Sequence, residues 1–142
     1  MGVLIVGAVA LRSVSRMEQA TDFTVHKTES CGCCVKWVDH LESFGFTVVA
    51  LNVEDIDTIR KQRRVPSALG SCHTATAGEY TFEGHVPADL IKRVLAERPV
   101  IAGLAVPGMP IGSPGMEQPG HQQPYNVIAF DKDGRTSLYA TR

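Results

Sequence analysis

The sequence predicts an α/β fold built on a mixed β-sheet with helices on both faces. Strand and helix patterns alternate twice in the first half of the chain, and a β-hairpin followed by one more helix comes next. With 142 residues, of which 44% are hydrophobic and 20% charged, the chain can bury one core without disulfides. A net charge of −1 gives no reason to expect nucleic acid as a partner.

An apolar segment, Gly2 to Leu11, lies near the start of the chain. A membrane-spanning helix needs about 20 such residues, so we expect no stable transmembrane span. The segment does fit the hydrophobic part of a secretory signal. We therefore expect residues 1–20 to be an export signal or leader, residues 21–142 to be a single domain, and the protein to be periplasmic. A buried first strand is the alternative, because no basic residue precedes the segment.

The first half of the chain predicts two strands, each followed by a helix. Residues 22–27 alternate in polarity and contain β-branched and aromatic side chains, which is typical of a strand. From Cys34 onward, apolar residues recur at helical spacing until Gly45, a residue suited to the end of a helix. Residues 46–51 are almost all apolar and predict a buried parallel strand.

A short helix and a hairpin are expected next. Asn52 can cap a helix that ends in the basic run 60–64, whose charges we expect to be solvated. Residues 72–77 and 80–85 flank Gly78-Glu79, a pair typical of a hairpin turn.

The last third of the chain predicts a helix, a long loop and a second hairpin. Pro87 suits the first position of a helix that runs to about Arg98. Six of the eight prolines lie in residues 99–124, where we expect a Pro/Gly-rich loop without regular structure, a kind of segment that is usually functional or disordered. Residues 125–130 and 136–141 predict a C-terminal β-hairpin.

Four cysteines fall into two groups, Cys31/Cys33/Cys34 and Cys72. The first group lies where a strand passes into a helix, and the helix N-terminus favours the thiolate form. Cys31 and Cys34 form a C-x-x-C pair typical of dithiol redox chemistry, but Cys33 between them offers a competing disulfide partner. Three crowded thiolates suit a soft metal ion such as Cu(I), and zinc also accepts thiolate. We expect Cys72, on a neighbouring strand, to lie within bridging reach of them.

Two methionines, Met109 and Met116, distinguish copper from zinc. Both lie in the Pro/Gly-rich loop, which has few other apolar anchors. Thioether sulfur suits Cu(I) much better than it suits zinc. The alternative is that each methionine only anchors the loop to the core.

Five histidines are candidates for imidazole ligands. His73 follows the fourth cysteine directly, but neighbouring strand side chains point to opposite faces, so the two need not reach one metal ion. For His73 and His85 a hydrogen-bonded structural role is an equal alternative. His26 is a weaker candidate, and His40 is expected to be solvated on its helix. The position of His121 in the Pro/Gly-rich loop gives no basis for ranking it as a ligand.

These motifs together resemble the CopG-type bacterial metal-resistance proteins. The resemblance covers roughly Asp22 to the C-terminus and rests on Lys27, Cys31-Gly32-Cys33-Cys34 with Trp37, Val65-Pro66-Ser67, Ser71-Cys72-His73-Thr74, Glu83 to Pro87, and Ala105 to Glu117. It implies a thioredoxin-like fold, a periplasmic location and copper binding in metal resistance. Applied to this chain, it implies a metal site of Cys31, Cys33, Cys34, Cys72, His85, Met109 and Met116.

The sequence thus predicts a protein that holds Cu(I), as one or several ions, in a cluster of Cys, Met and His side chains. Redox cycling to Cu(II) and an oxidoreductase activity are left open. The expected partners are copper ions and other copper-resistance or electron-transfer proteins. The alternatives are a thiol–disulfide oxidoreductase acting through Cys31 and Cys34, and a structural zinc domain, which would leave both methionines unused.

Overall fold

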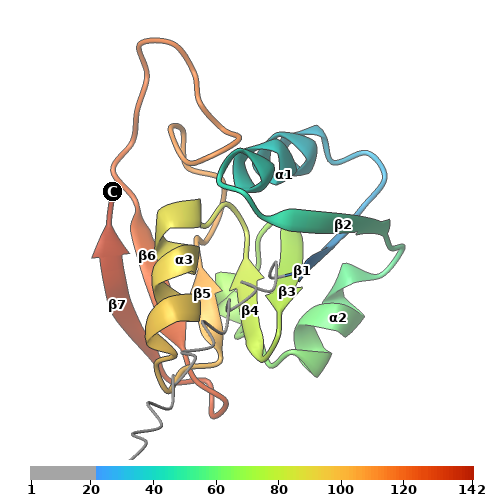
Figure 1. Ribbon diagram of the computed structural model, residues 1–142, viewed down its shortest axis with the longest axis vertical. Coiled ribbons are helices and arrows are strands. Elements are labelled where there is room, and N and C mark those ends of the chain that lie inside the picture. Colours follow the sequence, from blue (N-terminus) through green and yellow to red (C-terminus); the bar gives the residue numbers. More distant parts are fainter. Residues whose placement is uncertain (1–21) are drawn as a thin grey trace, which may run out of the picture.

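The structure is a computed structural model that describes residues 22–142, so the predicted export signal lies outside the described residues. Seven strands form a mixed sheet in the order β2-β1-β3-β4-β5-β6-β7, accompanied by three α-helices (Figure 1). The predicted mixed α/β fold is confirmed. The elements are β1 (Asp22–Lys27), α1 (Gly32–Ser43), β2 (Thr47–Asn52), α2 (Ile56–Gln62), the 3-10 turn η1 (Ser67–Leu69), β3 (His73–Ala77), β4 (Tyr80–Glu83), α3 (Ala88–Glu97), β5 (Gly103–Ala105), β6 (Asn126–Phe130) and β7 (Thr136–Thr141).

Helices lie on both faces of the sheet. Trp37 of α1 and Ile91 of α3 share one core cluster with inward-facing strand residues such as Phe82. Alternate strand residues form a smaller cluster with Val65 and Leu69 on the opposite face, where α2 contacts β3 and β1. Within residues 22–142, no helix combines the length and apolarity that crossing a bilayer requires.

Strand β2 is parallel to β1, as expected, but its burial was predicted wrongly. Among the described strands it pairs with β1 alone, at one edge of the sheet (Figure 1). Most of its side chains are exposed, and Val49 is 52% exposed. The apolar composition of β2 suggested a buried strand. Its actual burial depends on its position at the sheet edge, which composition does not reveal.

The cap of α2 also differs from the prediction. Asp55, not Asn52, precedes the helix, and its Oδ1 accepts hydrogen bonds from the N–H groups of Asp57 (3.0 Å) and Thr58 (3.2 Å). Asn52 is the last residue of β2. A capping side chain reaches only the second and third helical N–H groups, so a residue three positions earlier cannot replace it.

The segment expected to lack regular structure contains the interior strand β5, which pairs with β4 and β6. Three residues are too few to produce a recognisable periodicity. Gly103 is required there, because a Cβ atom would collide with the carbonyl oxygen of Thr81 on β4. The stretch that follows β5, residues 106–125, is called the Pro/Gly-rich loop from here on. It passes close to the start of α1 before the predicted C-terminal hairpin, β6–β7, begins (Figure 1).

Candidate metal centre

Both cysteine groups meet at the end of β1. Cys31 is the N-cap of α1, and Cys33 and Cys34 lie in its first turn. Cys72 directly precedes β3, whose first residue, His73, pairs with the last residue of β1. The antiparallel pairing therefore brings the start of β3 to the point where α1 begins. The four Sγ atoms all lie within 4.8 Å of one another.

Cys31 and Cys34 are joined by a disulfide, with their Cα atoms 5.4 Å apart. Cys33 and Cys72 are free thiols, and the Cys33 Sγ lies 3.5 Å from the Cys31 Sγ. A disulfide sulfur cannot act as a thiolate ligand, so in this oxidised state two of the four sulfurs are unavailable to a metal ion. Adding two electrons and two protons to the disulfide restores all four thiols.

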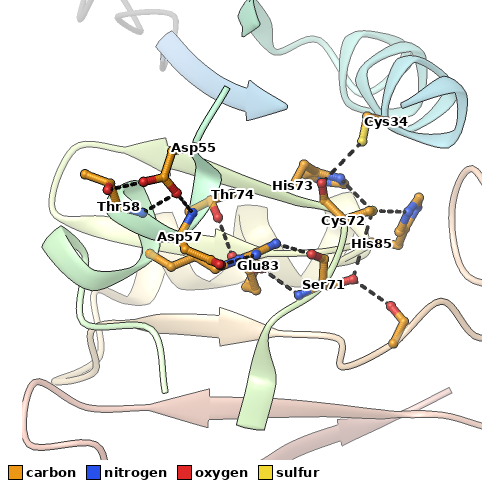
Figure 2. Close-up of polar contacts among 12 residues, drawn as sticks. Cys34, Asp55, Asp57, Thr58, Ser71, Cys72, His73, Thr74, Glu83 and His85 are labelled. Atoms are coloured by element: carbon orange, nitrogen blue, oxygen red, sulfur yellow. Dashed lines mark hydrogen bonds and ion pairs between the residues drawn. The ribbon is translucent and has the colours of Figure 1, made fainter. Parts of the chain in front are cut away.

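Two imidazoles flank the Cys72 sulfur, as Figure 2 shows. Its Sγ lies 2.9 Å from Nε2 of His85 and 3.2 Å from Nδ1 of His73. Sequence alternation led us to expect Cys72 and His73 on opposite faces. Because Cys72 precedes the strand instead of belonging to it, that rule does not apply, and the two side chains lie together. Cys72, His73 and His85 form a second group of potential metal ligands within 4.8 Å of one another.

Burial sets the protonation of this second group. It raises the pKa of the Cys72 thiol to about 12, with a further contribution from neighbouring Cys33. It lowers the pKa of His73 to about 3, helped by the proximity of His85, and it also lowers the pKa of His85. At neutral pH both imidazoles are therefore neutral, which is the form that binds metals, whereas a metal ion must displace the proton of Cys72.

The His85 side chain is oriented by the Pro/Gly-rich loop. Its Nδ1–H donates to the Pro114 carbonyl oxygen at 2.6 Å, which leaves the Nε2 lone pair facing Cys72. A metal-binding histidine is commonly held in this way, by a hydrogen bond from its other ring nitrogen to a carbonyl oxygen.

The same loop brings both methionines to the cluster. The Sδ atom of Met109 lies 3.9 Å from the Sγ atom of Cys33, and its side chain is 51% exposed. Met116 is half-buried and lines a surface hollow of about 410 Å³ together with Cys33. Both loop methionines therefore border Cys33, although only Met109 is in sulfur–sulfur contact with it.

Gly115 and Ser71 hold the loop in this position. Gly115 has a φ of +87°, and a Cβ atom there would lie 3.0 Å from the Cys33 carbonyl oxygen and 3.2 Å from Nδ1 of His85. Ser71 Oγ donates to the Gly108 carbonyl oxygen at 2.6 Å. The composition of the loop indicated turns, but it did not show that Gly115 permits the loop to pack directly on Cys33 and His85.

A buried ion pair between Glu83 and Arg60 fixes the backbone just before Cys72. Glu83 is fully buried, and its Oε1 accepts hydrogen bonds from Arg60 Nε and from the Ser71 N–H, both at 2.7 Å. Its Oε2 accepts from Thr74 Oγ1 at 2.5 Å, and Arg60 also donates to the Ser71 carbonyl oxygen. The carboxylate and guanidinium thus fix both backbone groups of Ser71, which precedes Cys72 (Figure 2). Arg60 was expected to be solvated, but its side chain is only 16% exposed.

The remaining histidines belong to neither group of potential ligands. His26 pairs with Thr74 in the sheet, on the face opposite His73. His121 is exposed, and its Nδ1 lies 3.1 Å from the Pro119 carbonyl oxygen. His40 was expected to be solvated, but it is half-buried and its Nε2 accepts a hydrogen bond from the Ala88 N–H (3.1 Å) at the start of α3.

The chain is similar to one family of proteins and to two solved structures. Residues 69–116, which contain Cys72, His85 and both loop methionines, match a family described as a protein of unknown function, DUF411. Two solved structures, entitled "Copper resistance protein copG", Form 1 and Form 2, are 40% identical to this chain with a TM-score of 0.83. Each covers 87% of this chain, and the matches cover 98% of Form 1 and 99% of Form 2. No curated protein matches the chain.

Proposed function

The chain belongs to the family of the copper resistance protein CopG, and on this basis we propose that it binds copper as Cu(I) in metal resistance. The observation that carries the proposal is the convergence of four cysteine sulfurs, from two separate segments, within 4.8 Å of one another. Thiolate and thioether ligands favour Cu(I) over harder ions.

The proposed ligand set combines three kinds of donor. The thiolates can bridge, so several Cu(I) ions can share them, and the Nε2 lone pair of His85 already faces the cluster. The Met109 thioether contacts Cys33, and the Met116 side chain lines the adjacent hollow. The full set is Cys31, Cys33, Cys34, Cys72, His85, Met109 and Met116.

Reduction precedes full copper loading in this proposal. A dithiol reductant, either a protein or a small molecule, transfers two electrons and two protons to the Cys31–Cys34 disulfide and is itself oxidised to a disulfide. Copper then replaces the thiol protons, including the proton of Cys72, and these protons pass to solvent. Cycling of the bound copper between Cu(I) and Cu(II) belongs to the same proposal, with an electron-transfer protein accepting one electron from Cu(I) and returning one to Cu(II).

Metal analysis combined with X-ray absorption spectroscopy on protein reduced and loaded without oxygen tests this function. We expect retained copper, an edge typical of Cu(I), and a first shell dominated by sulfur. A chain that retains no copper, or that binds it through nitrogen and oxygen alone, would contradict the proposal.

The disulfide itself favours a second candidate function, a thiol–disulfide oxidoreductase. Cys31 and Cys34 span the start of α1, where the helix N-terminus favours a reactive thiolate. Turnover of a disulfide substrate by metal-free protein would support this candidate, whereas copper retention without such turnover would favour the first. A structural zinc domain is a weaker candidate, because it gives the Met109–Cys33 contact no role.

The cellular setting forms part of the proposal. We place the protein in the periplasm, with residues 1–20 as the leader and residues 21–142 as one metal-binding domain that exchanges copper or electrons with other copper-resistance proteins. The strand order β2-β1-β3-β4, with α1 after β1 and α3 after β4, supports a thioredoxin-like scaffold for that domain.

A further inference from the structure

The His73 side chain lies against the cluster but outside the proposed ligand set. It is fully buried, and its ring packs on that of Trp37 with a centroid separation of 4.3 Å. Its Nδ1 lies 3.2 Å from the Cys72 Sγ, while its Nε2 has no hydrogen-bond partner among the described residues. Figure 2 shows Cys72 between the two imidazoles.

A count of protons decides which nitrogen of His73 carries its hydrogen. The Pro114 carbonyl oxygen can only accept, so the proton of His85 is on Nδ1 and its Nε2 must accept. The single thiol proton of Cys72 is therefore donated to Nε2 of His85, 2.9 Å away. The sulfur is then an acceptor towards His73, whose Nδ1 must carry the proton. The other tautomer would set the lone pairs of Nδ1 and of the Cys72 sulfur face to face at 3.2 Å.

Building on the proposed copper function, we propose that His73 is a positioning residue whose Nδ1–H donates a hydrogen bond to the Cys72 sulfur and thereby favours Cu(I) over Cu(II). When copper replaces the thiol proton, the bond from Cys72 to His85 is lost, but the N–H of His73 still points at the sulfur. Hydrogen bonds to a ligating cysteine sulfur are known to tune the potential of the bound metal. The sulfur carries more negative charge when the copper is reduced, so a donor stabilises the reduced state more.

The expected size of the effect follows from the energy of one such bond. A hydrogen bond to a charged acceptor changes an equilibrium by about tenfold or more. Because the sulfur accepts this bond in both oxidation states, only part of its energy affects the potential, so loss of the His73 donor should lower the preference for Cu(I) over Cu(II) by up to about tenfold, which corresponds to about 59 mV at most in a one-electron couple.

Two substitutions separate hydrogen bonding from packing. His73→Phe keeps an aromatic ring against Trp37 but removes the donor, whereas His73→Asn places an amide N–H close to the position of Nδ1. We expect both variants to bind as many copper ions as the parent. In protein-film voltammetry, His73→Phe should show the lowered potential and His73→Asn should remain close to the parent.

A measurement on the metal-free parent tests the hydrogen bond without any variant. Nitrogen-15 NMR of the histidine rings should show that Nδ1 of His73 is protonated and that Nε2 is not. The opposite tautomer would overturn the proposal, and so would an unchanged potential in fully loaded His73→Phe. Loss of copper ions from both variants would make His73 a ligand and would also overturn it. If the parent retains no copper, the proposed copper function fails, while the tautomer measurement still decides whether this hydrogen bond exists.

Discussion

Replacement of Arg60 by methionine tests how the buried ion pair supports the site. Methionine keeps much of the aliphatic length but removes the donors to Glu83 and to the Ser71 carbonyl oxygen. Breaking a buried ion pair by removing one partner typically costs about 3–5 kcal/mol. The Arg60 side chain is 16% exposed and Glu83 keeps donors from Ser71 and Thr74, so we expect the lower end, about 3 kcal/mol. For a chain of this size that corresponds to a fall of roughly 6–12 °C in Tm.

The loss should depend on pH in a defined direction. Burial already raises the pKa of Glu83 above its ordinary value of 4.5, although Arg60 opposes this. A raised carboxyl pKa contributes stability that is present at low pH and is lost as the pH rises through the folded-state pKa. Removing Arg60 raises this pKa further. The stability difference between parent and Arg60→Met should therefore be smallest near pH ~4 and should increase towards neutral pH.

Urea unfolding of metal-free protein across this pH range is the direct assay. Lys61→Met is the matched control, because Lys61 is exposed on the same helix and makes no ion pair among the described residues. The double variant Arg60→Met/Glu83→Leu removes both charges and should recover part of the loss. If Arg60→Met were no less stable than Lys61→Met, or if its deficit did not increase with pH, the argument for a supporting ion pair would be refuted.

Three further predictions concern the loop and the disulfide. Met109→Leu and Met116→Leu should each change the unfolding free energy of the metal-free protein by less than about 1.5 kcal/mol. Competition titration should show weaker Cu(I) binding in at least one of them. Parent-like Cu(I) affinity in both would show that the loop covers the cluster without supplying a ligand. Gly115→Ala should cost at least about 1–2 kcal/mol from its positive φ and should also weaken Cu(I) binding, whereas Gly120→Ala, with a φ of +74° but open space around it, should cost only the strain. Protein that keeps the Cys31–Cys34 disulfide should bind fewer copper ions by metal analysis than protein reduced before loading, and equal copper content would show that these two sulfurs are not ligands.

Much of the fold was predictable because local signals agreed with the tertiary structure. The alternation in residues 22–27, the glycine at position 45 and the Gly78-Glu79 turn each predicted the element or boundary that the structure shows. The failures have physical causes. β5 is only three residues long, and the exposure of β2 follows from its position at the sheet edge rather than from its own residues.

The site was predictable only as far as chain adjacency and the predicted strand pairing allowed. The approach of Cys72 to the first cysteine group is confirmed, because the predicted neighbouring strand β3 pairs with β1 and so brings Cys72 to the start of α1. The contacts of Arg60 and His40 involve partners 23 and 48 residues away, and a basic run or a mid-helix histidine gives no local sign of them. The role of Gly115 was hidden because every glycine in a Pro/Gly-rich loop looks alike until the packing is known.

The packing around Trp37 explains why copper should not be needed for folding. Its Nε1–H donates to the Val86 carbonyl oxygen at 2.9 Å, which fixes α1 to the segment that carries His85, and its ring packs on His73. Trp37 also belongs to the main hydrophobic core, so the core itself holds the pieces of the site together. A site formed in this way is present before metal arrives, unlike a zinc finger, where metal binding supplies the folding free energy. Under the proposed copper function, ordering of the chain should therefore take little from the affinity for copper, and substitutions of the proposed ligands should change metal binding far more than stability.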